Sequence, residues 1–413
     1  MDRPRVMLVA PTAAYQTDDF AAAADRLGVD LALGTDRCHV LAEVWPEGAL
    51  ALDFRDPPGA AGAIAADAAA RPLHGIAAVD ERSALIASLA ADRLGLRCSA
   101  PAAVATAGNK LAFRRALAAA GVPQPEFQAL PAVAGAAEIT LAPPLVVKPV
   151  HLSASRGVIG VAEPAALPAA LARVRALLAD PEVTVKDPDA AGWLLVERFV
   201  AGPEVAFEGL LERGRLHALA LFDKPDPLDG PLFPDTIYVA PSAAPAALQA
   251  EVAGVVAAAA AAIGLAEGPV HAELRLGEHG PVMLELAARA IGGLCGRTLR
   301  FGAGITLEEV ILCHALGRAP ASLRRSDGAS GVCMLPVPAA GVLRDVDGSG
   351  AAAAVPGVVD IAITARIGDV LVPLPEGHTY MGFLFARGDR PEEVVAALRR
   401  ARDHIRFEVT PLL

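Results

Sequence analysis

The sequence predicts an α/β protein with more than one domain. From Arg5 to about Ser99, short apolar strands alternate with alanine-rich helical segments, a pattern typical of βαβ units on a parallel sheet. Later segments alternate apolar and polar residues with a period of two, which indicates antiparallel hairpins. The chain has 413 residues, and at roughly 100–200 residues per domain this length favours two to four domains.

The net charge limits the classes of partner. The formal charge is −11 at pH 7, whereas a general nucleic-acid binder needs a basic surface that neutralises phosphates. An anionic membrane surface is disfavoured for the same reason. We therefore expect no nucleic-acid or membrane partner, although a few local lysines and backbone amides suffice to bind a nucleotide.

The cysteines and the apolar segments predict a soluble, cytoplasmic protein. The number of cysteines is odd and no two have C-x-x-C spacing, which argues against a zinc ribbon or a disulfide framework. Reduced thiols are the simpler interpretation, with a reactive thiol at Cys295 as the alternative. The N-terminal apolar run is too short for a signal peptide, and the longest apolar stretch, 252–266, predicts a buried helix shorter than a membrane span. The five cysteines are Cys38, Cys98, Cys295, Cys313 and Cys333.

Residues 1–104 are predicted to form the parallel-sheet domain. The run 5–10 is typical of a buried strand, and a helical pattern follows at about 18–27. Strand and helix patterns then continue to alternate up to the end of this domain. The first strand is not followed by G-x-G-x-x-G, so the dinucleotide-binding fingerprint is absent.

Residues 105–200 are predicted to form a central lobe. Asn109 and Lys110 open a helix that ends at Gly121, because glycine and the prolines that follow stop a helix. We expect a strand at 144–148, a polar loop at 153–157, a helix at about 165–179 and a strand at 193–198.

Residues 201–413 are predicted to form a C-terminal lobe with an appended tail. Strands are expected at about 204–211 and 215–221, followed by a proline-rich loop at 223–241 and an alanine helix at about 246–264. A hairpin follows, with strands at 270–276 and 281–287. The tail ends in a helix at about 391–404 and a strand near 405–409.

The hairpin carries a pair of carboxylates. If its register centres on His279, Glu273 lies directly across from Glu285 on the polar face. Two carboxylates about 5 Å apart repel by about 3 kcal/mol at an effective dielectric constant near 20, so a divalent cation such as Mg²⁺ is a natural partner. The alternative is a solvated face on which His271 and Arg275 serve as counter-charges, and a register slip would separate the pair.

Two lysines stand at the ends of predicted elements. Lys110 begins a helix, and Lys148 ends an apolar strand that is followed by the polar loop 153–157. Lysine suits phosphate oxygens as a compact charge, and the hydroxyls and amides of such a loop can bind a phosphate. The alternative for either lysine is a solvated surface charge. The loop is not a Walker A motif.

These segments, in this order, resemble the ATP-grasp superfamily over most of the chain. The resemblance implies the ATP-grasp fold, in which a nucleotide lies in a cleft between two α+β lobes. It implies ATP and Mg²⁺ as cofactors, and a homodimer is common among similar ligases. The implied phosphate-binding residues are Lys110, Lys148, Ser153, Ser155 and Gly157; those for adenine and ribose are Glu197, Phe199, Val200 and Glu204.

The resemblance also implies a metal site and a catalytic arginine. Glu273 and Glu285 match the metal ligands of the family, and Arg289 matches its catalytic arginine, which would stabilise charge on the transferring phosphoryl group. Many members carry Asn two residues after the second Glu, where this chain has Ala287. That departure removes one expected ligand, but it is similar to the E-x-A-A-R pattern of the L-amino acid ligase branch.

The loop 222–242 is similar to the same branch, in which it borders the amino-acid site. Lys224 and Tyr238 are therefore substrate-binding candidates, and Gly292 and Gly293 would let a substrate approach the backbone. Related ligases can place histidine where Tyr238 stands, so the substrate of this chain can differ from theirs. The alternatives are a stiff proline-rich loop and a plain glycine turn.

Three functions follow. The first is an ATP-dependent ligase that joins small carboxylate and amine substrates, most directly amino acids, through an acyl phosphate. The second is another ATP-grasp ligase or carboxylase, of purine-biosynthesis or biotin-dependent type. The third is a non-catalytic nucleotide-binding module, which the presence of both lysines, both carboxylates and Arg289 disfavours.

Overall fold

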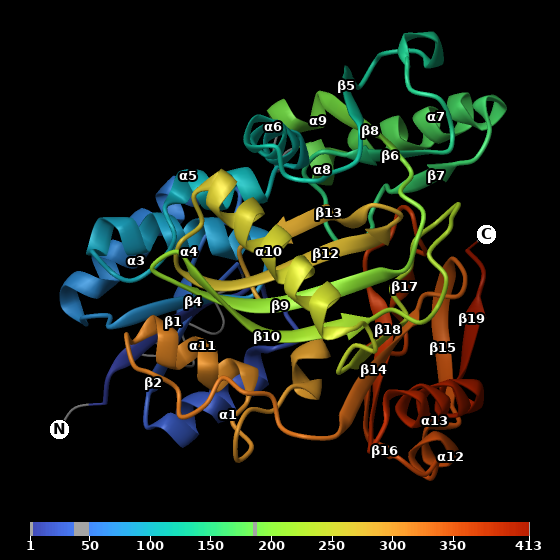
Figure 1. Ribbon diagram of the computed structural model, residues 1–413. Coiled ribbons are helices and arrows are strands. Elements are labelled where there is room, and N and C mark those ends of the chain that lie inside the picture. Colours follow the sequence, from blue (N-terminus) through green and yellow to red (C-terminus); the bar gives the residue numbers. More distant parts are fainter. Residues whose placement is uncertain (1–2, 37–48, 185–187, 413) are drawn as a thin grey trace.

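The described residues of the protein form four β-sheets in a computed structural model (Figure 1). The structure describes residues 3–36, 49–184 and 188–412, so Cys38 lies outside it. Mixed helices and sheets with a parallel N-terminal sheet confirm the predicted α/β class. The division of the chain at residues 104 and 200 stays a prediction.

The N-terminal sheet is parallel, with strand order β3-β2-β1-β4. Strand β1 is fully buried, as its apolar run requires. Its strands are β1 (Arg5–Val9), β2 (Asp30–Thr35), β3 (Ala49–Ala51) and β4 (Gly75–Ala78); the helices of this part are α1 (Thr17–Leu27), α3 (Pro57–Ala70), α4 (Glu81–Leu94) and α5 (Pro101–Ala107).

A small antiparallel sheet with order β5-β8-β6-β7 forms the lobe at the top of Figure 1. Helix α6 (Lys110–Ala120) leads into it, and α7 (Leu167–Leu178) packs against β6 and β7. The strands are β5 (Phe127–Pro131), β6 (Leu145–Pro149), β7 (Ile159–Val161) and β8 (Trp193–Arg198); α8 (Pro181–Thr184) and α9 (Pro188–Ala191) precede β8.

The largest sheet has eight antiparallel strands in the order β13-β12-β9-β10-β11-β14-β18-β16. The expected loop 223–241 contains one of them, β11, because all four of its residues are buried between β10 and β14. The tail also contributes strands to this sheet. The eight strands are β9 (Glu204–Glu212), β10 (Arg215–Asp223), β11 (Ile237–Ala240), β12 (Gly268–Gly277), β13 (Gly280–Ala287), β14 (Ala329–Pro336), β16 (Val358–Ile363) and β18 (Tyr380–Gly388).

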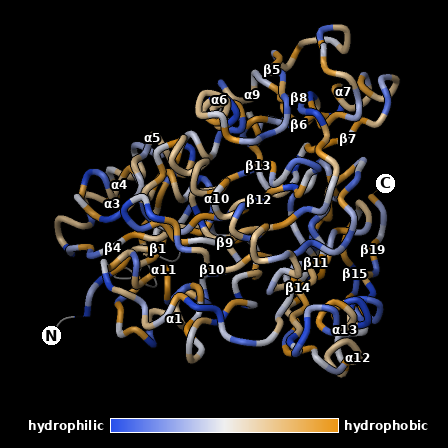
Figure 2. Tube along the Cα trace, viewed as in Figure 1, coloured by the Kyte–Doolittle hydropathy of each residue, from blue (hydrophilic) through white to orange (hydrophobic). Residues whose placement is uncertain are grey.

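Helices on both sides complete the large sheet, and apolar residues gather along its strands (Figure 2). Helix α10 (Ala246–Ile263) covers one side, while α11 (Leu307–Ala315) packs against α1 and β4 of the N-terminal sheet. Helix α13 (Pro391–His404) packs on β14 and β18. The remaining elements are β15 (Gly341–Asp347), β17 (Val370–Leu371), β19 (Arg406–Thr410) and α12 (Ser349–Ala353).

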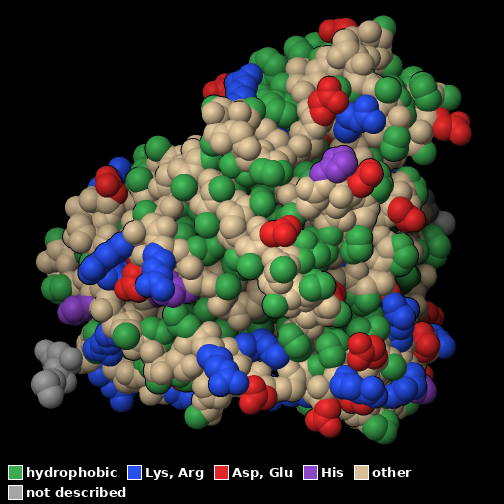
Figure 3. Space-filling model, in the orientation of Figure 1, with side chains coloured by type: hydrophobic (Ala, Val, Ile, Leu, Met, Phe, Trp, Pro, Cys, Tyr) green, Lys and Arg blue, Asp and Glu red, His purple; other side chains and the backbone are tan. Residues whose placement is uncertain are grey.

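Helix α10 is the one described helix long and apolar enough to cross a membrane by length and composition. The prediction of a buried helix is correct for one face only, since 28% of this window is buried. That face, which includes Val252 and Val256, packs into the same cluster as Leu274 and Met283 of the large sheet. On the side of the whole molecule that Figure 3 shows, acidic and basic side chains lie among one another.

Asn109 fixes the start of α6, because its side-chain oxygen accepts hydrogen bonds from the N–H groups of Leu111 (3.1 Å) and Ala112 (3.0 Å). We expect Asn109→Ala to lower the free energy of unfolding by about 1 kcal/mol through loss of this cap. Urea unfolding followed by circular dichroism measures the change. Asn109→Asp retains a capping oxygen and serves as the control, so equal stability of the two variants would contradict the assignment.

Candidate active site

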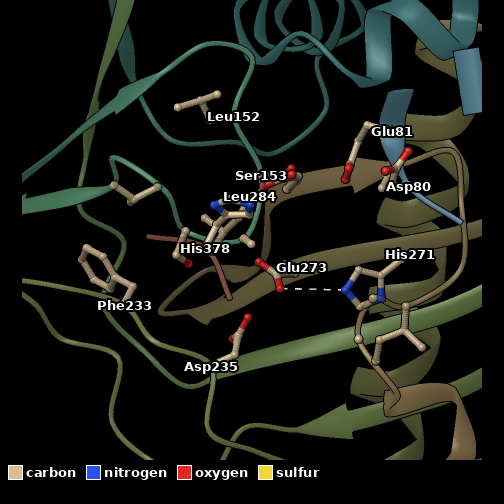
Figure 4. Close-up of a pocket in the computed structure, with 18 of the residues that line it drawn as sticks. Asp80, Glu81, Leu152, Ser153, Phe233, Asp235, His271, Glu273, Leu284 and His378 are labelled. Atoms are coloured by element: carbon tan, nitrogen blue, oxygen red, sulfur yellow. Dashed lines mark ion pairs between the residues drawn. The ribbon is translucent and has the colours of Figure 1, made fainter. Parts of the chain in front are cut away.

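A cavity of about 580 Å³ collects side chains from every major part of the protein. The N-terminal part contributes Tyr15 and Glu81, the small lobe contributes Lys148, the large sheet contributes Glu273, and the tail contributes Tyr380. Figure 4 shows the carboxyl groups of Glu273 and Asp235 pointing toward one another inside this cavity. The cavity therefore brings together residues far apart in sequence.

The predicted carboxylate pair is present on the β12–β13 hairpin. Glu273 pairs with Glu285, as the sequence predicts, although the turn pairs Gly277 with Gly280. These two pairings occur in one hairpin because a β-bulge follows Glu273 and makes Leu284 an extra residue of β13. Without that bulge the register set by the turn would place Leu284 opposite Glu273.

A different lysine pairs with each of the two carboxylates. The Lys110 ammonium lies 3.2 Å from the Glu285 carboxylate, and the Lys224 ammonium lies 2.9 Å from that of Glu273. Arg275, a counter-charge in the solvated-face alternative, contacts Glu204 instead, at 3.0 Å. Glu273 and Glu285 face the cavity with side-chain exposures of 25% and 32%, so this face of the hairpin is not an open, solvated surface.

The same pair of carboxylates fits Mg²⁺. Glu273 and Glu285 offer hard oxygen ligands from adjacent strands, and they remain partly accessible from the cavity. Burial acts to raise the pKa of Glu273, but the charges of Lys224 and His271 outweigh it and hold this pKa well below its usual range. The Glu273 carboxylate is therefore ionised, as a metal ligand must be.

A buried ion triad forms part of the small-lobe wall of the cavity, with Lys148 and Glu197 lining it and Arg114 behind them. The Glu197 carboxylate accepts from Arg114 at 2.6 Å and lies 2.7 Å from the Lys148 ammonium. Burial acts to raise the pKa of Glu197, but the charges of Arg114 and Lys148 outweigh it and lower the pKa to about 2. Burial lowers the pKa of Lys148, and the Glu197 carboxylate opposes that effect.

A second charge cluster forms the floor of the cavity around Lys224. Its ammonium lies 2.6 Å from Glu204, 2.8 Å from Asp235 and 2.9 Å from Glu273. Burial and the neighbouring carboxylates of Glu273 and Glu204 outweigh the attraction of Lys224 and raise the pKa of Asp235 to about 6. The opposite holds for Lys224, whose pKa is raised well above its usual value because three carboxylates overcome the effect of burial.

Arg289 is fixed by the N-terminal part of the protein. Its guanidinium donates to the Glu81 carboxylate at 2.5 and 3.0 Å and to the Ala290 carbonyl at 2.8 Å. Glu81 is the first residue of α4, directly after the capping residue Asp80. Burial opposes the charge of Arg289, but Glu81 and the nearby Glu285 and Asp80 raise its pKa, so the guanidinium is charged.

Two of the predicted site residues do not line the cavity. Lys224 lies beneath the floor, enclosed by its carboxylate partners. Gly157 donates its N–H to the Pro375 carbonyl at 2.7 Å, and a side chain at this position would clash with Pro149 and Leu177. The predicted residues that do line it are Lys110, Lys148, Ser153, Ser155, Glu197, Phe199, Val200, Glu204, Tyr238, Glu273, Glu285, Arg289, Gly292 and Gly293.

Several residues of the site were not predicted. Arg114 has a weak sequence signal, because it follows Lys110 by one helical turn and therefore shares its face. Glu81 and Tyr380 carry no such signal, since their positions depend on packing between distant segments. Asp235 lies in the loop that the sequence singles out, but its ion pair with Lys224 is known only from the structure.

Cys295 shows no sign of a reactive thiol. It is buried, with its Sγ 3.7 Å from Met334 Sδ. Burial, together with the nearby carboxylates, raises the pKa of its thiol well above the usual range, so the thiolate is disfavoured. Among the described residues, Cys98, Cys313 and Cys333 are also free.

Comparison with known proteins identifies the family. The ATP-grasp domain family matches residues 141–298, the ATP-grasp N-terminal domain family matches 20–96, and the L-amino acid ligase C-terminal domain 2 family matches 333–410. The chain belongs to the ATP-grasp superfamily. Within it, the C-terminal match confirms the resemblance to the L-amino acid ligase branch.

Solved structures share this fold. The chain superposes on the L-amino acid ligase from Bacillus licheniformis with a TM-score of 0.84 at 24% identity, covering 99% of this chain and 100% of that one. For carboxyaminoimidazole ribonucleotide synthase from Aspergillus clavatus complexed with ATP, the TM-score is 0.73 at 17% identity, covering 98% and 100%. Likeness at these identities shows the fold alone.

A sequence relative adds no assigned activity. The uncharacterized protein y4rH of Sinorhizobium fredii is 27% identical over 315 residues, which are 75% of this chain. The matched region spans 63% of the length of that relative. Activity, substrates and partners are therefore matters of proposal.

The buried triad predicts a pH-dependent stability. We expect Glu197→Gln to lower the free energy of unfolding by about 3 kcal/mol at pH 7, because it leaves Arg114 and Lys148 without their carboxylate. The depressed pKa of Glu197 stabilises the fold fully above about 4.5, and this contribution is lost as the pH falls toward about 2. The difference between wild type and variant should therefore shrink over that window.

Urea unfolding at a series of pH values measures the difference. The exposed Glu251 of α10 provides the control, since Glu251→Gln should leave the free energy of unfolding nearly unchanged throughout. A wild-type-to-Glu197→Gln difference that stays constant between pH 7 and 2 would rule out the ionic origin of the stabilisation.

Proposed function

We propose that the protein is an ATP-dependent ligase that joins a small carboxylate to an amine, most directly two amino acids, and releases ADP and phosphate. One observation carries the proposal: Glu273 and Glu285 stand opposite each other on the wall of a cavity that also contains Lys110, Lys148 and Arg289. The family match at the C-terminus supports amino acids as the substrates.

The proposed reaction has two steps. A substrate carboxylate oxygen attacks the γ-phosphorus of ATP, the bond to the ADP oxygen breaks, and an acyl phosphate forms. The amine nitrogen then attacks the acyl carbon, phosphate leaves with the carbon–oxygen bond pair, and the nitrogen loses a proton. When bound, Mg²⁺ would supply Lewis-acid neutralisation of phosphate oxygens, and Glu273 and Glu285 would hold it.

The side chains of this chain supply electrostatic stabilisation. Lys110 and Lys148 present ammonium groups from the start of α6 and from β6, and Arg289 presents a charged guanidinium from the segment that follows β13. Glu81 holds that guanidinium in place, so its orientation is set before a substrate binds. The loop residues Ser153 and Ser155 line the cavity, where they can cover phosphates and exclude water.

A substrate screen tests the proposed reaction class. The protein is incubated with ATP, Mg²⁺ and pooled amino acids, and ADP is measured together with the mass of any dipeptide formed. ADP and a matching dipeptide are the expected outcome. ADP that appears only with bicarbonate or a purine precursor would instead assign the carboxylase or purine-type reaction, and no ADP with any mixture would favour a non-catalytic module.

We expect Glu285→Ala to reduce ADP formation by at least about 100-fold, because it removes one of two carboxylates proposed to hold the metal. Glu278, exposed in the turn of the same hairpin, provides the matched control, and Glu278→Ala should retain wild-type turnover. Circular dichroism verifies the fold of both variants. Wild-type turnover by Glu285→Ala would remove the metal assignment.

A further inference from the structure

We infer that Lys224 is a positioning residue, a built-in cation that holds the proposed ribose-binding and metal-binding carboxylates in place rather than a residue that contacts substrate. The inference rests on the proposed function for the roles of Glu204 and Glu273. The contacts that Lys224 makes, however, do not depend on a bound substrate. It gives a role to the one predicted substrate residue that lies beneath the cavity.

The three carboxylates around Lys224 come from three different parts of the large sheet and its loops. Glu204 begins β9, Glu273 lies in β12, and Asp235 lies in the loop before β11. Lys224 follows directly after β10. The ammonium thus joins segments that are separated by up to 49 residues from the lysine itself, and each of these segments contributes a side chain to the cavity.

The hydrogen-bonding capacity of Lys224 is fully used. An ammonium group has three N–H donors and no acceptor, and three carboxylate oxygens lie 2.6, 2.8 and 2.9 Å from this nitrogen. The side chain is 3% exposed, and its nitrogen also lies 4.9 Å from the centre of the Tyr238 ring. Lys224 therefore has no donor left for a ligand.

Without the Lys224 ammonium, the three carboxylates would repel one another. One oxygen each of Glu204, Asp235 and Glu273 lies within 4.8 Å of the other two, a spacing suited to a hard cation. Lys224 occupies the centre of this group. By filling it with a tethered charge, the protein keeps a free cation out of the floor and leaves Glu273 available to the cavity together with Glu285.

Residues next to the cluster connect it to the proposed adenine and metal sites. Glu204 also accepts from Arg275 at 3.0 Å, and the guanidinium of Arg275 lies 4.8 Å from the centre of the Phe199 ring at the proposed adenine site. Tyr238 donates to Glu273 at 3.1 Å. Loss of the Lys224 charge should therefore disturb nucleotide binding as well as the metal site.

The test uses the substitution Lys224→Ala and two binding measurements that require no turnover. Calorimetry with Mg²⁺ and ADP should show an affinity reduced by about 10–100-fold, the usual range when a group that orients a metal ligand is lost. Methylammonium, which is small enough to occupy the space of the deleted side chain, should restore much of that affinity. Mg²⁺ alone should raise the unfolding temperature of Lys224→Ala more than that of the wild type, because it can enter the vacated cluster.

A matched variant separates charge from packing. Lys224→Met fills similar space without charge, so it should lose MgADP affinity and gain no rescue by methylammonium. If Lys224→Ala does not fold, the double variant Lys224→Ala/Asp235→Asn, which removes one excess carboxylate, is used for the same measurements.

Two outcomes would overturn the inference. The first is wild-type MgADP affinity in a folded variant that lacks the ammonium. The second is a reduced affinity that methylammonium does not improve, which would show a packing role alone. Failure of the ligase proposal is distinguishable, because a wild-type protein that binds MgADP but forms no amide leaves the role of Lys224 intact.

Discussion

Compensation of charge around the β12–β13 hairpin is the constraint on which the rest of the site depends. Two carboxylates on adjacent strands repel each other, and a lysine from a different part of the chain accompanies each one: Lys224 for Glu273 and Lys110 for Glu285. Such pairs cost desolvation energy when they are buried, so they persist only where geometry satisfies both partners. The pairing therefore fixes the hairpin relative to the segments that supply the lysines.

The same charges connect the small lobe to the large sheet. Lys110 reaches Glu285, and one turn further along α6 Arg114 donates to the carbonyls of Met283 (3.2 Å) and Leu284 (2.6 Å). Arg114 also holds Glu197, which in turn contacts Lys148. One face of a single helix thus sets the distance between the proposed phosphate-binding lysines and the proposed metal ligands. The asparagine cap that fixes the start of α6 acts on this geometry through the position of Lys110.

Local sequence patterns predict the strands and loops of the site better than the contacts between their side chains. Alternation with a period of two located the hairpin and the opposition of Glu273 and Glu285, because side-chain direction in a strand is a local property. The bulge at Leu284 was not predictable, since it compensates for a turn whose length depends on tertiary context. The sequence also singles out the loop around Lys224, where the family resemblance implies a substrate-binding lysine. Its burial under three carboxylates depends on contacts with residues 20 and 49 positions away.

The N-terminal sheet explains why residues outside the two ATP-grasp lobes reach the cavity. Parallel sheets present loops at the carboxyl ends of their strands, where ligands bind in open α/β folds. Strands β1 and β4 are neighbours, and the segments that follow them supply Tyr15 and Glu81 to the cavity wall. Glu81 acts there through Arg289, and Tyr15 packs edge-on against Phe383 of β18, 5.4 Å between ring centroids. The parallel sheet thus fixes the position of the Arg289 guanidinium through Glu81 and, through the contact of Tyr15 with Phe383, packs the N-terminal part against the tail strands.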